Sequence, residues 1–302
     1  MKLIIKKSDL LNMPCSEYDD LPDNEFDAIK EIANRGNHVE HVGWLIANCK
    51  LAQTAEMLTY FKSLTPSAYD VCLVILFCKF AQITEMLEYF KSLNPLKKDV
   101  SLLITNCRFA QTPEMLAYYK SLKPSVEDVS WLITDCKFTQ TADMLVYYRS
   151  LYPLTKDISS LIRNCKVAQT TRMLLYFKSC EPLAEDVSWL IAGCKFTQTT
   201  KMLKYYKSLS PSAEGVSWLI KNCKFTQTAK MLEYFKSCRP SACNVSLLIA
   251  NCKFAQTANM LAYYKSLKPS KKDVSWLINN CKFATRIRRR HNETNDKKER
   301  ST

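Results

Sequence analysis

Apolar residues recur along most of the chain in two short helical patterns that alternate. In the stretch that begins at Val216, numbered here as position 1, apolar side chains stand at positions 1, 4, 5 and 8: Val216, Leu219, Ile220 and Cys223. This is the i, i+3, i+4, i+7 spacing of one helix face. After the segment Phe-Thr-Gln-Thr, a second apolar arc runs from Met231 to Cys238. The pattern predicts two helices of about 11 to 13 residues each, joined by a short polar turn.

The pair of patterns repeats every 29 residues. One cysteine column carries the period most clearly: Cys49, Cys78, Cys107, Cys136, Cys165, Cys194, Cys223, Cys252 and Cys281. Methionines from Met57 to Met260 and prolines from Pro66 to Pro269 keep the same spacing. Self-similarity at a period of this length is the signature of a repeat protein. The sequence therefore predicts eight whole units and a final half unit.

The ends of the two predicted helices carry recognisable signals. Ser67 and Asp70 have the Ser-x-x-Asp spacing of a capping box, which predicts the start of the first helix. Thr at position 13, such as Thr228, is the expected N-cap of the second helix. Pro at position 25 ends that helix, because the residue before a proline is disfavoured in the α region. Each unit is therefore a hairpin of two helices.

Helices this short are unstable alone in water, so each hairpin has to stack on its neighbours. We predict an all-α, right-handed α-solenoid of eight and a half two-helix repeats over residues 42–285. Residues 1–41 are expected to form an acidic N-terminal cap with a helix that ends at Gly36, and residues 286–302 a basic disordered tail. The strings WLIKNCKF and MLEYFKSCRPS resemble the helix pair of pentatricopeptide repeats, and tetratricopeptide repeats are similar in plan. The resemblance implies the same stacked-hairpin architecture.

Composition narrows the classes of function. The net charge is +14, and it divides into −4 for residues 1–41, +4 for residues 286–302 and +14 for the body between them. Four glycines in 302 residues disfavour a nucleotide-binding glycine loop, and no apolar stretch is long enough to predict a membrane span. Fourteen cysteines without an export signal indicate a reducing, cytoplasmic setting. The Arg286–Arg290 cluster leaves a nuclear address as an alternative.

Catalytic and metal chemistry finds little support in the sequence. No cysteine pair has the spacing of a metal-binding motif, so the periodic cysteines are expected to be small buried core residues, and we expect no cofactor. His38 and His41 flank Glu40 but are expected to be solvated. The Met, Tyr/Phe and Trp columns are interpreted as core packing. We therefore expect no enzyme and no small-molecule substrate.

The candidate binding residues lie on the surface. Positions 9 and 21 are basic in every unit, which is interpreted either as neutralisation of helix dipoles or as a row of contacts to an anionic partner. Position 15 changes from acidic near the N-terminus to basic near the C-terminus. The candidate partner-binding residues are Lys137, Lys166, Lys195, Lys224 and Lys253 at position 9, Arg149, Lys178, Lys207, Lys236 and Lys265 at position 21, and Arg172, Lys201 and Lys230 at position 15.

These surfaces predict a non-enzymatic scaffold that binds another protein through an acidic or extended segment. Single-stranded RNA, held by the same cations with exposed aromatic side chains as stacking partners, is the alternative. Asn at position 7, as in Asn222, is expected to form a hydrogen-bond ladder inside the stack, with a row of ligand contacts as the alternative. No membrane partner is expected.

Overall fold

Nearly all regular structure in the described part of the chain is helical. The computed structural model describes residues 2–10, 21, 24–33 and 38–284. Two short antiparallel strands, β1 (Ile4–Ile5) and β2 (Phe26–Asp27), precede helix α1 (Ala28–Ala33). The helix expected in the cap therefore begins at Ala28, and its predicted end at Gly36 lies outside the described residues, as does the predicted tail. The all-α prediction is confirmed for everything that follows.

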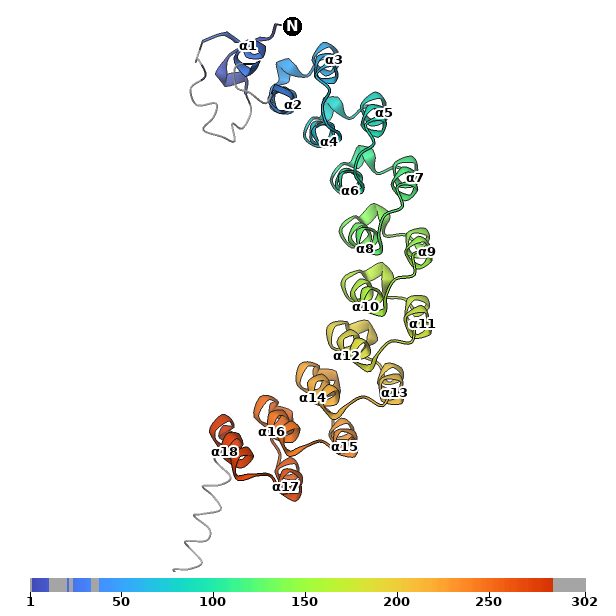
Figure 1. The fold of residues 1–302 in the computed structure, drawn as a ribbon, viewed down its shortest axis with the longest axis vertical. Helices are drawn as coiled ribbons and strands as arrows, with labels where there is room; N and C mark the ends of the chain where they lie inside the picture. Colours follow the sequence, from blue (N-terminus) through green and yellow to red (C-terminus); the bar gives the residue numbers. More distant parts are fainter. Residues whose placement is uncertain (1, 11–20, 22–23, 34–37, 285–302) are drawn as a thin grey trace, which may run out of the picture. The chain divides into compact units, whose positions relative to one another are not determined.

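From His38 onward, first and second helices alternate. The first helices are α2 (His38–Asn48), α4 (Ala68–Phe77), α6 (Lys97–Asn106), α8 (Val126–Asp135), α10 (Thr155–Asn164), α12 (Ala184–Gly193), α14 (Ala213–Asn222), α16 (Ala242–Asn251) and α18 (Lys271–Asn280). The second helices are α3 (Ala55–Ser63), α5 (Thr84–Ser92), α7 (Pro113–Ser121), α9 (Ala142–Ser150), α11 (Thr171–Ser179), α13 (Thr200–Ser208), α15 (Ala229–Ser237) and α17 (Ala258–Ser266). Within α2 to α9, and again within α10 to α18, Figure 1 shows the first helices in one layer and the second helices in another.

The helices are shorter than predicted because the turn between them has its own structure. From α4 to α18 the periodic cysteine is the C-cap of the first helix, and three residues of 3-10 helix follow each periodic cysteine from Cys49 to Cys252. These turns are η3 (Lys50–Ala52), η4 (Lys79–Ala81), η5 (Arg108–Ala110), η6 (Lys137–Thr139), η7 (Lys166–Ala168), η8 (Lys195–Thr197), η9 (Lys224–Thr226) and η10 (Lys253–Ala255). The next residue, a glutamine such as Gln227, donates from Nε2 to the Ile220 carbonyl at 3.2 Å. That bond satisfies a carbonyl that the helix end leaves open.

The predicted helix caps are confirmed. Threonine at position 13 accepts a hydrogen bond from the methionine N–H three residues on, as Thr228 does from Met231 at 3.3 Å. Ser67 and Asp70 form the reciprocal capping box, with Ser67 N–H to Asp70 Oδ2 at 2.9 Å. Where leucine replaces the serine, as at Leu96, the aspartate still accepts the N–H of the cap residue. Half of the box therefore survives the loss of the hydroxyl.

The second helices end before their prolines, as predicted. In each of these repeats, the residue directly before the proline has a positive φ of 49° to 55°. These eight residues are Thr65, Asn94, Lys123, Tyr152, Glu181, Ser210, Arg239 and Lys268. Proline excludes the right-handed α conformation from this residue, and the chain here takes the left-handed alternative instead of an extended one. The helix is thus closed without glycine.

The contacts divide the chain into two compact units, residues 1–152 and 153–302. Within each unit, every first helix packs on the next first helix and on its own second helix. The packed columns are buried, and they include all nine periodic cysteines. Several cysteine thiols donate weakly to an isoleucine carbonyl of the preceding repeat, as Cys223 Sγ does to Ile191 at 3.8 Å. Each unit is thus a helical-repeat stack whose core runs from one repeat into the next.

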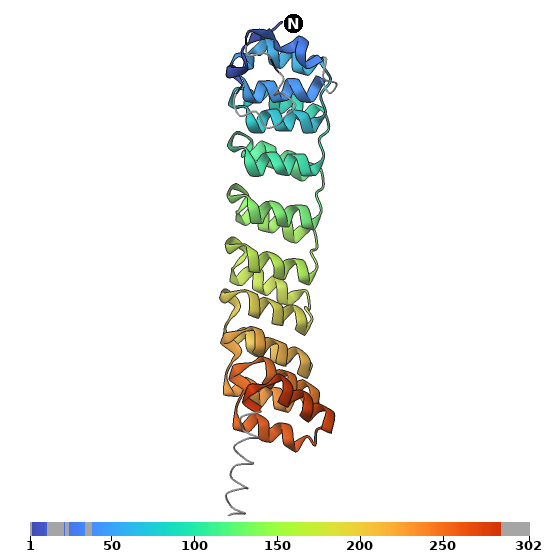
Figure 2. The same ribbon diagram turned by 90° about the vertical axis from the view of Figure 1, so that its left-hand side faces the viewer.

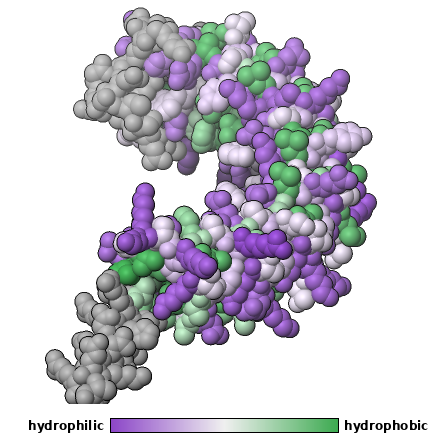
Figure 3. Space-filling model, turned by 60° about the horizontal axis from the view of Figure 1, so that its bottom comes forward, coloured by the Kyte–Doolittle hydropathy of each residue, from purple (hydrophilic) through white to green (hydrophobic). Residues whose placement is uncertain are grey.

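None of the helices in the described part of the chain has the length and hydrophobicity needed to cross a bilayer. On the face drawn in Figure 3, hydrophobic side chains occur as separate groups among hydrophilic ones. Binding surfaces therefore have to be sought among the exposed positions of individual repeats.

Candidate partner-binding surface

The two basic columns lie at opposite ends of the helices. The position 9 cations directly follow the cysteine caps, and from Lys50 to Lys253 each is the first residue of a 3-10 turn. The position 21 cations are the penultimate residues of the second helices, as Lys62 is in α3. A second helix of nine residues separates the two columns by about 12 Å. Figure 2 shows the 3-10 turns along one edge of the repeats and the extended connections along the other. The columns therefore do not form one continuous groove.

The position 21 lysines contact the tyrosine at position 19 of the next repeat. The lysine Nζ lies 4.5 to 5.8 Å from the ring centroid in the pairs Lys62–Tyr89, Lys91–Tyr118, Lys120–Tyr147, Lys178–Tyr205, Lys207–Tyr234 and Lys236–Tyr263. In most of these pairs the tyrosine hydroxyl also donates to the backbone carbonyl of the same lysine, as Tyr234 does at 3.3 Å. These lysines are half-buried, so the column connects neighbouring repeats. Its predicted role in partner binding stays a prediction.

The position 9 cations, in contrast, are all exposed: Lys50, Lys79, Arg108, Lys137, Lys166, Lys195, Lys224, Lys253 and Lys282. Among the described residues, their side chains make no hydrogen bond and no ion pair within the chain. Each follows the end of a first helix, where a positive charge is favoured by the helix dipole. Their charged groups remain available to a partner.

Position 15 lies at the same edge, in the first turn of each second helix, and is exposed in every repeat. In residues 1–152 it is acidic and balances the position 9 cations: Glu56, Glu85, Glu114 and Asp143. In residues 153–302 no acidic residue occupies either position. We define the basic edge as the eight exposed cations Lys166, Arg172, Lys195, Lys201, Lys224, Lys230, Lys253 and Lys282.

The charges at position 15 affect their own helices differently in the two units. A carboxylate in the first turn is stabilised by the helix N-terminus. Hydrogen bonds from its own backbone N–H and from the Thr112 side chain lower the pKa of Glu114. Arg172, Lys201 and Lys230 place a positive charge at the same position, where the helix dipole disfavours it. The second unit therefore keeps three cations that weaken its own helices.

The exposed side of the first helices differs from the prediction. The tryptophans at position 3 were expected to pack inside, but Trp131, Trp189 and Trp276 are 70%, 57% and 38% exposed. Position 3 faces away from the neighbouring helices because positions 1, 4 and 5 already fill the packed side. Trp189 and Trp218 stack on each other with ring centroids 5.7 Å apart and an angle of 7° between the planes.

The asparagines at position 7 do not form the ladder between repeats that the sequence predicted. Within the described part of the chain, the hydrogen bonds that their side-chain amides donate stay inside their own helix. Asn222 Nδ2 donates to the Trp218 carbonyl at 2.8 Å, and Asn280 donates to the Trp276 carbonyl in the same way. The bond leaves the amide oxygen and one N–H of each exposed asparagine directed away from that carbonyl. The asparagines therefore help to close their own helices.

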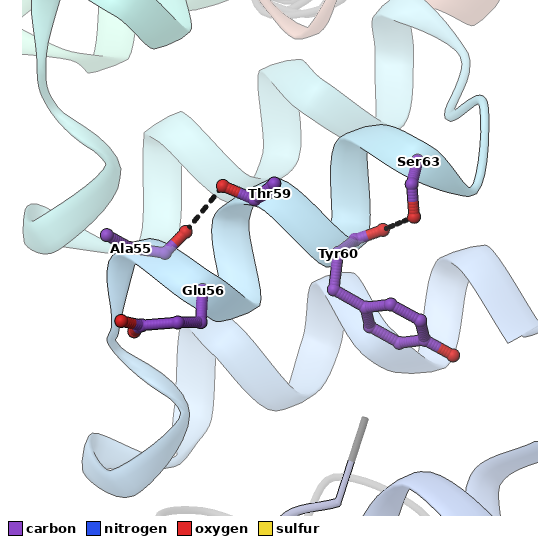
Figure 4. Close-up of a pocket in the computed structure, with 5 residues that line it drawn as sticks. All are labelled: Ala55, Glu56, Thr59, Tyr60 and Ser63. Carbon is purple, nitrogen blue, oxygen red and sulfur yellow. Dashed lines mark hydrogen bonds between the residues drawn. The ribbon is translucent and has the colours of Figure 1, made fainter.

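His38, at the start of α2, contacts a tyrosine of the second helix in the same repeat. His38 Nε2 lies 2.7 Å from the hydroxyl of Tyr60, and the two rings meet edge to face. Tyr60 also borders a shallow hollow of about 430 Å³ on α3. Figure 4 shows that the two hydroxyls there bond back to the helix, Thr59 to Ala55 and Ser63 to the Tyr60 carbonyl. Glu56 is the one carboxylate among the residues that line the hollow.

The cysteines and carboxylates also lack the arrangement of a metal centre. Across the described residues, no three His, Cys, Asp or Glu side chains lie close enough together to hold a metal ion. The cysteines in the described part of the chain form no disulfides. Burial raises the pKa of Cys72 to about 12 and raises that of Cys49 as well. A protonated, buried thiol is a poor nucleophile and a poor ligand, so these cysteines act as core residues.

Comparison with protein families, curated proteins and solved structures finds no match to this chain. Its function is therefore inferred from its own surfaces. Sequence reasoning identified the exposed cations at positions 9 and 15. It missed the pairing of position 21 with tyrosine, although basic and aromatic residues at positions 21 and 19 of nearly every repeat were a visible signal.

Proposed function

We propose that this protein is a non-enzymatic helical-repeat scaffold that binds an acidic or extended segment of a partner protein along the basic edge. One observation carries the proposal: three cations stand in the first turns of α11, α13 and α15, where they oppose the helix dipoles, beside position 9 cations without partners in the chain. An arrangement that weakens its own helices is expected where it serves binding. Regularly spaced positive charges favour a partner of complementary charge.

The proposed scaffold also has a defined handedness and number of repeats. We infer a right-handed stack of eight and a half 29-residue units, similar in plan to pentatricopeptide and tetratricopeptide repeats. Such stacks present extended surfaces, because each repeat contacts only its neighbours and repeats the same exposed positions along the stack. A partner in extended conformation can then contact one repeat after another.

Single-stranded RNA is the second candidate. The exposed rings of Trp189 and Trp276, on the same unit as the basic edge, support it, because bases stack on exposed aromatic side chains. RNA binding would also depend strongly on salt, since phosphate contacts release counterions.

Binding of two defined polyanions tests the proposal. Poly-L-glutamate and mixed-sequence single-stranded RNA are titrated into the full chain at a low and a near-physiological salt concentration. The variant Lys195→Glu/Lys224→Glu removes two cations of the basic edge, and Lys50→Glu/Lys79→Glu makes the same change at the balanced edge of residues 1–152. Both variants are checked for native thermal unfolding.

We expect polyglutamate to bind, and the Lys195/Lys224 variant to lose about tenfold or more in affinity while the Lys50/Lys79 variant changes little. Equal losses in the two folded variants would contradict a role of the basic edge. Tighter binding of RNA than of polyglutamate near physiological salt would replace the protein partner by the second candidate.

A further inference from the structure

A small pocket opens between α10 and α12, on the exposed side of the first helices in residues 153–302. It has a volume of about 170 Å³. The residues that matter for its chemistry are Lys156, Ser159, Ser160 and Arg163 from α10 and Asp186 and Trp189 from α12. It combines an aromatic ring, two cations, two hydroxyls and a carboxylate. No other hollow described above brings such groups together.

Two departures from the repeat pattern lie beside Arg163, which lines this pocket. Position 3 is Trp or Leu in eight repeats, but Ser160 occupies it in α10. Position 7 is Gly193 in α12, where six repeats have Asn. Arg163 lies across this glycine, since a Cβ atom at residue 193 would collide with Arg163 Cδ. The small residue at 193 therefore makes room for the arginine, and the serine at 160 leaves the space of a large side chain empty.

The empty space lies where a third aromatic ring would extend the stack of Trp189 and Trp218. Trp189 is covered on the side of α14 by the parallel ring of Trp218. On the side of α10 its ring borders the pocket, because Ser160 stands where a further tryptophan would otherwise lie. Trp189 is 57% exposed. A planar group entering the pocket would continue the stack, which aromatic rings favour at centroid distances of about 4.5 to 7 Å.

The charges around this space favour acidic groups on both sides of the ring. Lys156 and Arg163 are seven residues apart on α10, so their backbones lie about 10 Å apart along the helix, one on each side of Ser159 and Ser160. Among the described residues, neither cation has an ion pair or hydrogen-bond partner for its charged group. An extended peptide advances about 3.3 Å per residue, so residues one or two places from a bound ring reach this span.

Asp186 adds a hydrogen-bond acceptor to the wall of the pocket. Its Oδ2 accepts from Thr155 Oγ1 at 2.7 Å and from the Leu183 N–H at 3.3 Å. These bonds hold the carboxylate in place, and its remaining lone pairs suit a phenol or amide donor.

We propose that this pocket, the ring slot, binds the side chain of a tyrosine in the partner protein, with acidic residues of the same segment contacting Lys156 and Arg163. The inference rests on the proposed function, of which it specifies the recognised segment. Nucleic acid fits less well. Trp189 and Trp218 stack directly and leave no space for a base between them, Leu247 interrupts the aromatic column, and the Asp186 carboxylate repels phosphate.

Synthetic polypeptides test the ring slot in the full chain. The probes are the random copolymer of glutamate and tyrosine, poly-L-glutamate as its counterpart without rings, and poly(U). Ser160→Trp fills the slot, and Leu247→Trp makes a similar change at the same position of α16. Arg163→Ala removes one flanking cation, and Lys221→Ala removes the cation at the same position of α14.

We expect the wild-type protein to bind the copolymer about tenfold more tightly than polyglutamate. Ser160→Trp and Arg163→Ala should each remove most of that preference, while Leu247→Trp and Lys221→Ala retain it. Equal binding of both polypeptides by the wild type would overturn the inference, as would a preference that survives in the folded Ser160→Trp variant. If poly(U) binds more tightly than the copolymer and loses affinity in the same two variants, the slot is a nucleotide site and the peptide assignment is wrong.

The Lys195→Glu/Lys224→Glu variant distinguishes the role of the basic edge from the role of the ring slot. We expect this variant to lose affinity for both polypeptides equally and so to keep their ratio. If it binds both polypeptides as tightly as the wild type does, while the ratio still depends on Ser160, the proposed role of the basic edge fails and the ring slot stands. If it loses affinity for both and the wild type shows no tyrosine preference, the slot fails and the edge stands.

Discussion

The unit of residues 1–152 and the unit of residues 153–302 have cores built from the same columns of residues, but they differ along one edge. In both, the same columns of valine, leucine, isoleucine, cysteine and methionine are buried, and threonine caps the second helices, with Ile83 as the exception in the first unit. At the edge formed by the 3-10 turns, the first unit has one carboxylate at position 15 for each cation at position 9. The second unit carries cations at both positions in three successive repeats.

The difference shows which positions folding constrains. A repeat has to fit both of its neighbours, so a change in a core column would disturb two interfaces. An exposed residue in the first turn of a helix affects that helix alone, by a few tenths of a kcal/mol to about 1 kcal/mol. The edge can therefore change its charge while the stack is preserved, and the charge of an edge is the property that an anionic partner detects.

Exchanging the charges of the two edges should have the largest effect. In Arg172→Glu/Lys201→Glu/Lys230→Glu, the second unit receives the pattern of the first. We expect affinity for polyglutamate to fall about hundredfold, because three attractive charges become repulsive. Stability should rise by about 0.5 kcal/mol per site, since carboxylates suit the helix N-terminus. Titration calorimetry and chemical unfolding measure the two quantities.

The reverse exchange tests the same difference in the first unit. Glu56→Lys/Glu85→Lys/Glu114→Lys gives the first unit a basic edge, and we expect it to gain affinity for polyglutamate while its stability falls. A triple variant in the second unit that loses stability as well as binding would mean that the three cations support the fold, contrary to the proposed division between edge and core.

Alkaline pH should affect both units alike, because the tyrosines belong to the shared core. Burial raises the pKa of Tyr119 and Tyr206 above the ordinary value near 10, and it also raises the pKa of half-buried tyrosines such as Tyr118 and Tyr234. Above pH 10 the unfolded chain therefore releases protons that the folded chain retains, so stability is lost as pH rises. The slope is about 1.4 kcal/mol per pH unit for each tyrosine that ionises only on unfolding.

Chemical unfolding between pH 8 and pH 11 measures this loss. We expect the unfolding free energy to begin to fall between pH 8 and pH 9, where Cys49 and Cys72 ionise on unfolding, and to fall steeply above pH 10, where the tyrosines do. A stability that stays flat to pH 11 would show that the tyrosines ionise equally in both states and are not part of a buried interface.

The sequence predicted the repeat, the helix pair and the caps because these depend on residues close together in the chain. Cys223 recurs every 29 residues, and Ser67 and Asp70 stand three residues apart, so each signal is complete within one or two repeats. The 3-10 turn was missed because it depends on Gln227 reaching back seven residues to Ile220, a contact that apolar periodicity does not report.

The surfaces were harder to predict because side chains of different repeats meet there. Position 21 appeared to be a free row of cations, whereas Lys207 lies on the ring of Tyr234, 27 residues further along the chain. The ring slot combines Ser160 and Arg163 with Gly193 of the following repeat. Each departure is visible in its own column, but their meeting point follows only from the packing of α10 on α12.

Removal of a buried tyrosine hydroxyl, one in each unit, should have a smaller effect and should raise the stability. Tyr119 and Tyr206 are fully buried at position 20, and within the described residues their hydroxyls have no hydrogen-bond partner. Phenylalanine fills the same position in other repeats, as at Phe90 and Phe235. Tyr119→Phe and Tyr206→Phe should each stabilise the protein by about 1 kcal/mol, since an unsatisfied buried polar group is removed. Thermal unfolding measures the change.

The matched control is Tyr234→Phe at position 19. Its hydroxyl donates to the Lys207 carbonyl at 3.3 Å, so we expect a loss of about 0.5 to 1 kcal/mol there. If Tyr119→Phe destabilised the first unit while Tyr206→Phe stabilised the second, the two cores would differ, and the comparison between the units could no longer rest on the edge alone.

The contact between lysine and tyrosine should give the smallest effect, and the chain holds its own control. Lys207 Nζ lies 4.5 Å from the centroid of the Tyr234 ring, and Lys207→Met keeps the aliphatic stem while removing the charge. We expect a loss of about 0.5 to 1 kcal/mol, the usual size of a cation–π contact at a partly exposed site. Lys265 occupies the same position in α17, is exposed, and is followed by no further second helix among the described residues, so Lys265→Met should leave the unfolding free energy unchanged. Since both lysines stand in the last turn of a second helix, dipole neutralisation alone would make the two losses equal. A larger loss at Lys207 assigns the column to the interface between repeats, and equal losses would return position 21 to the candidates for partner binding.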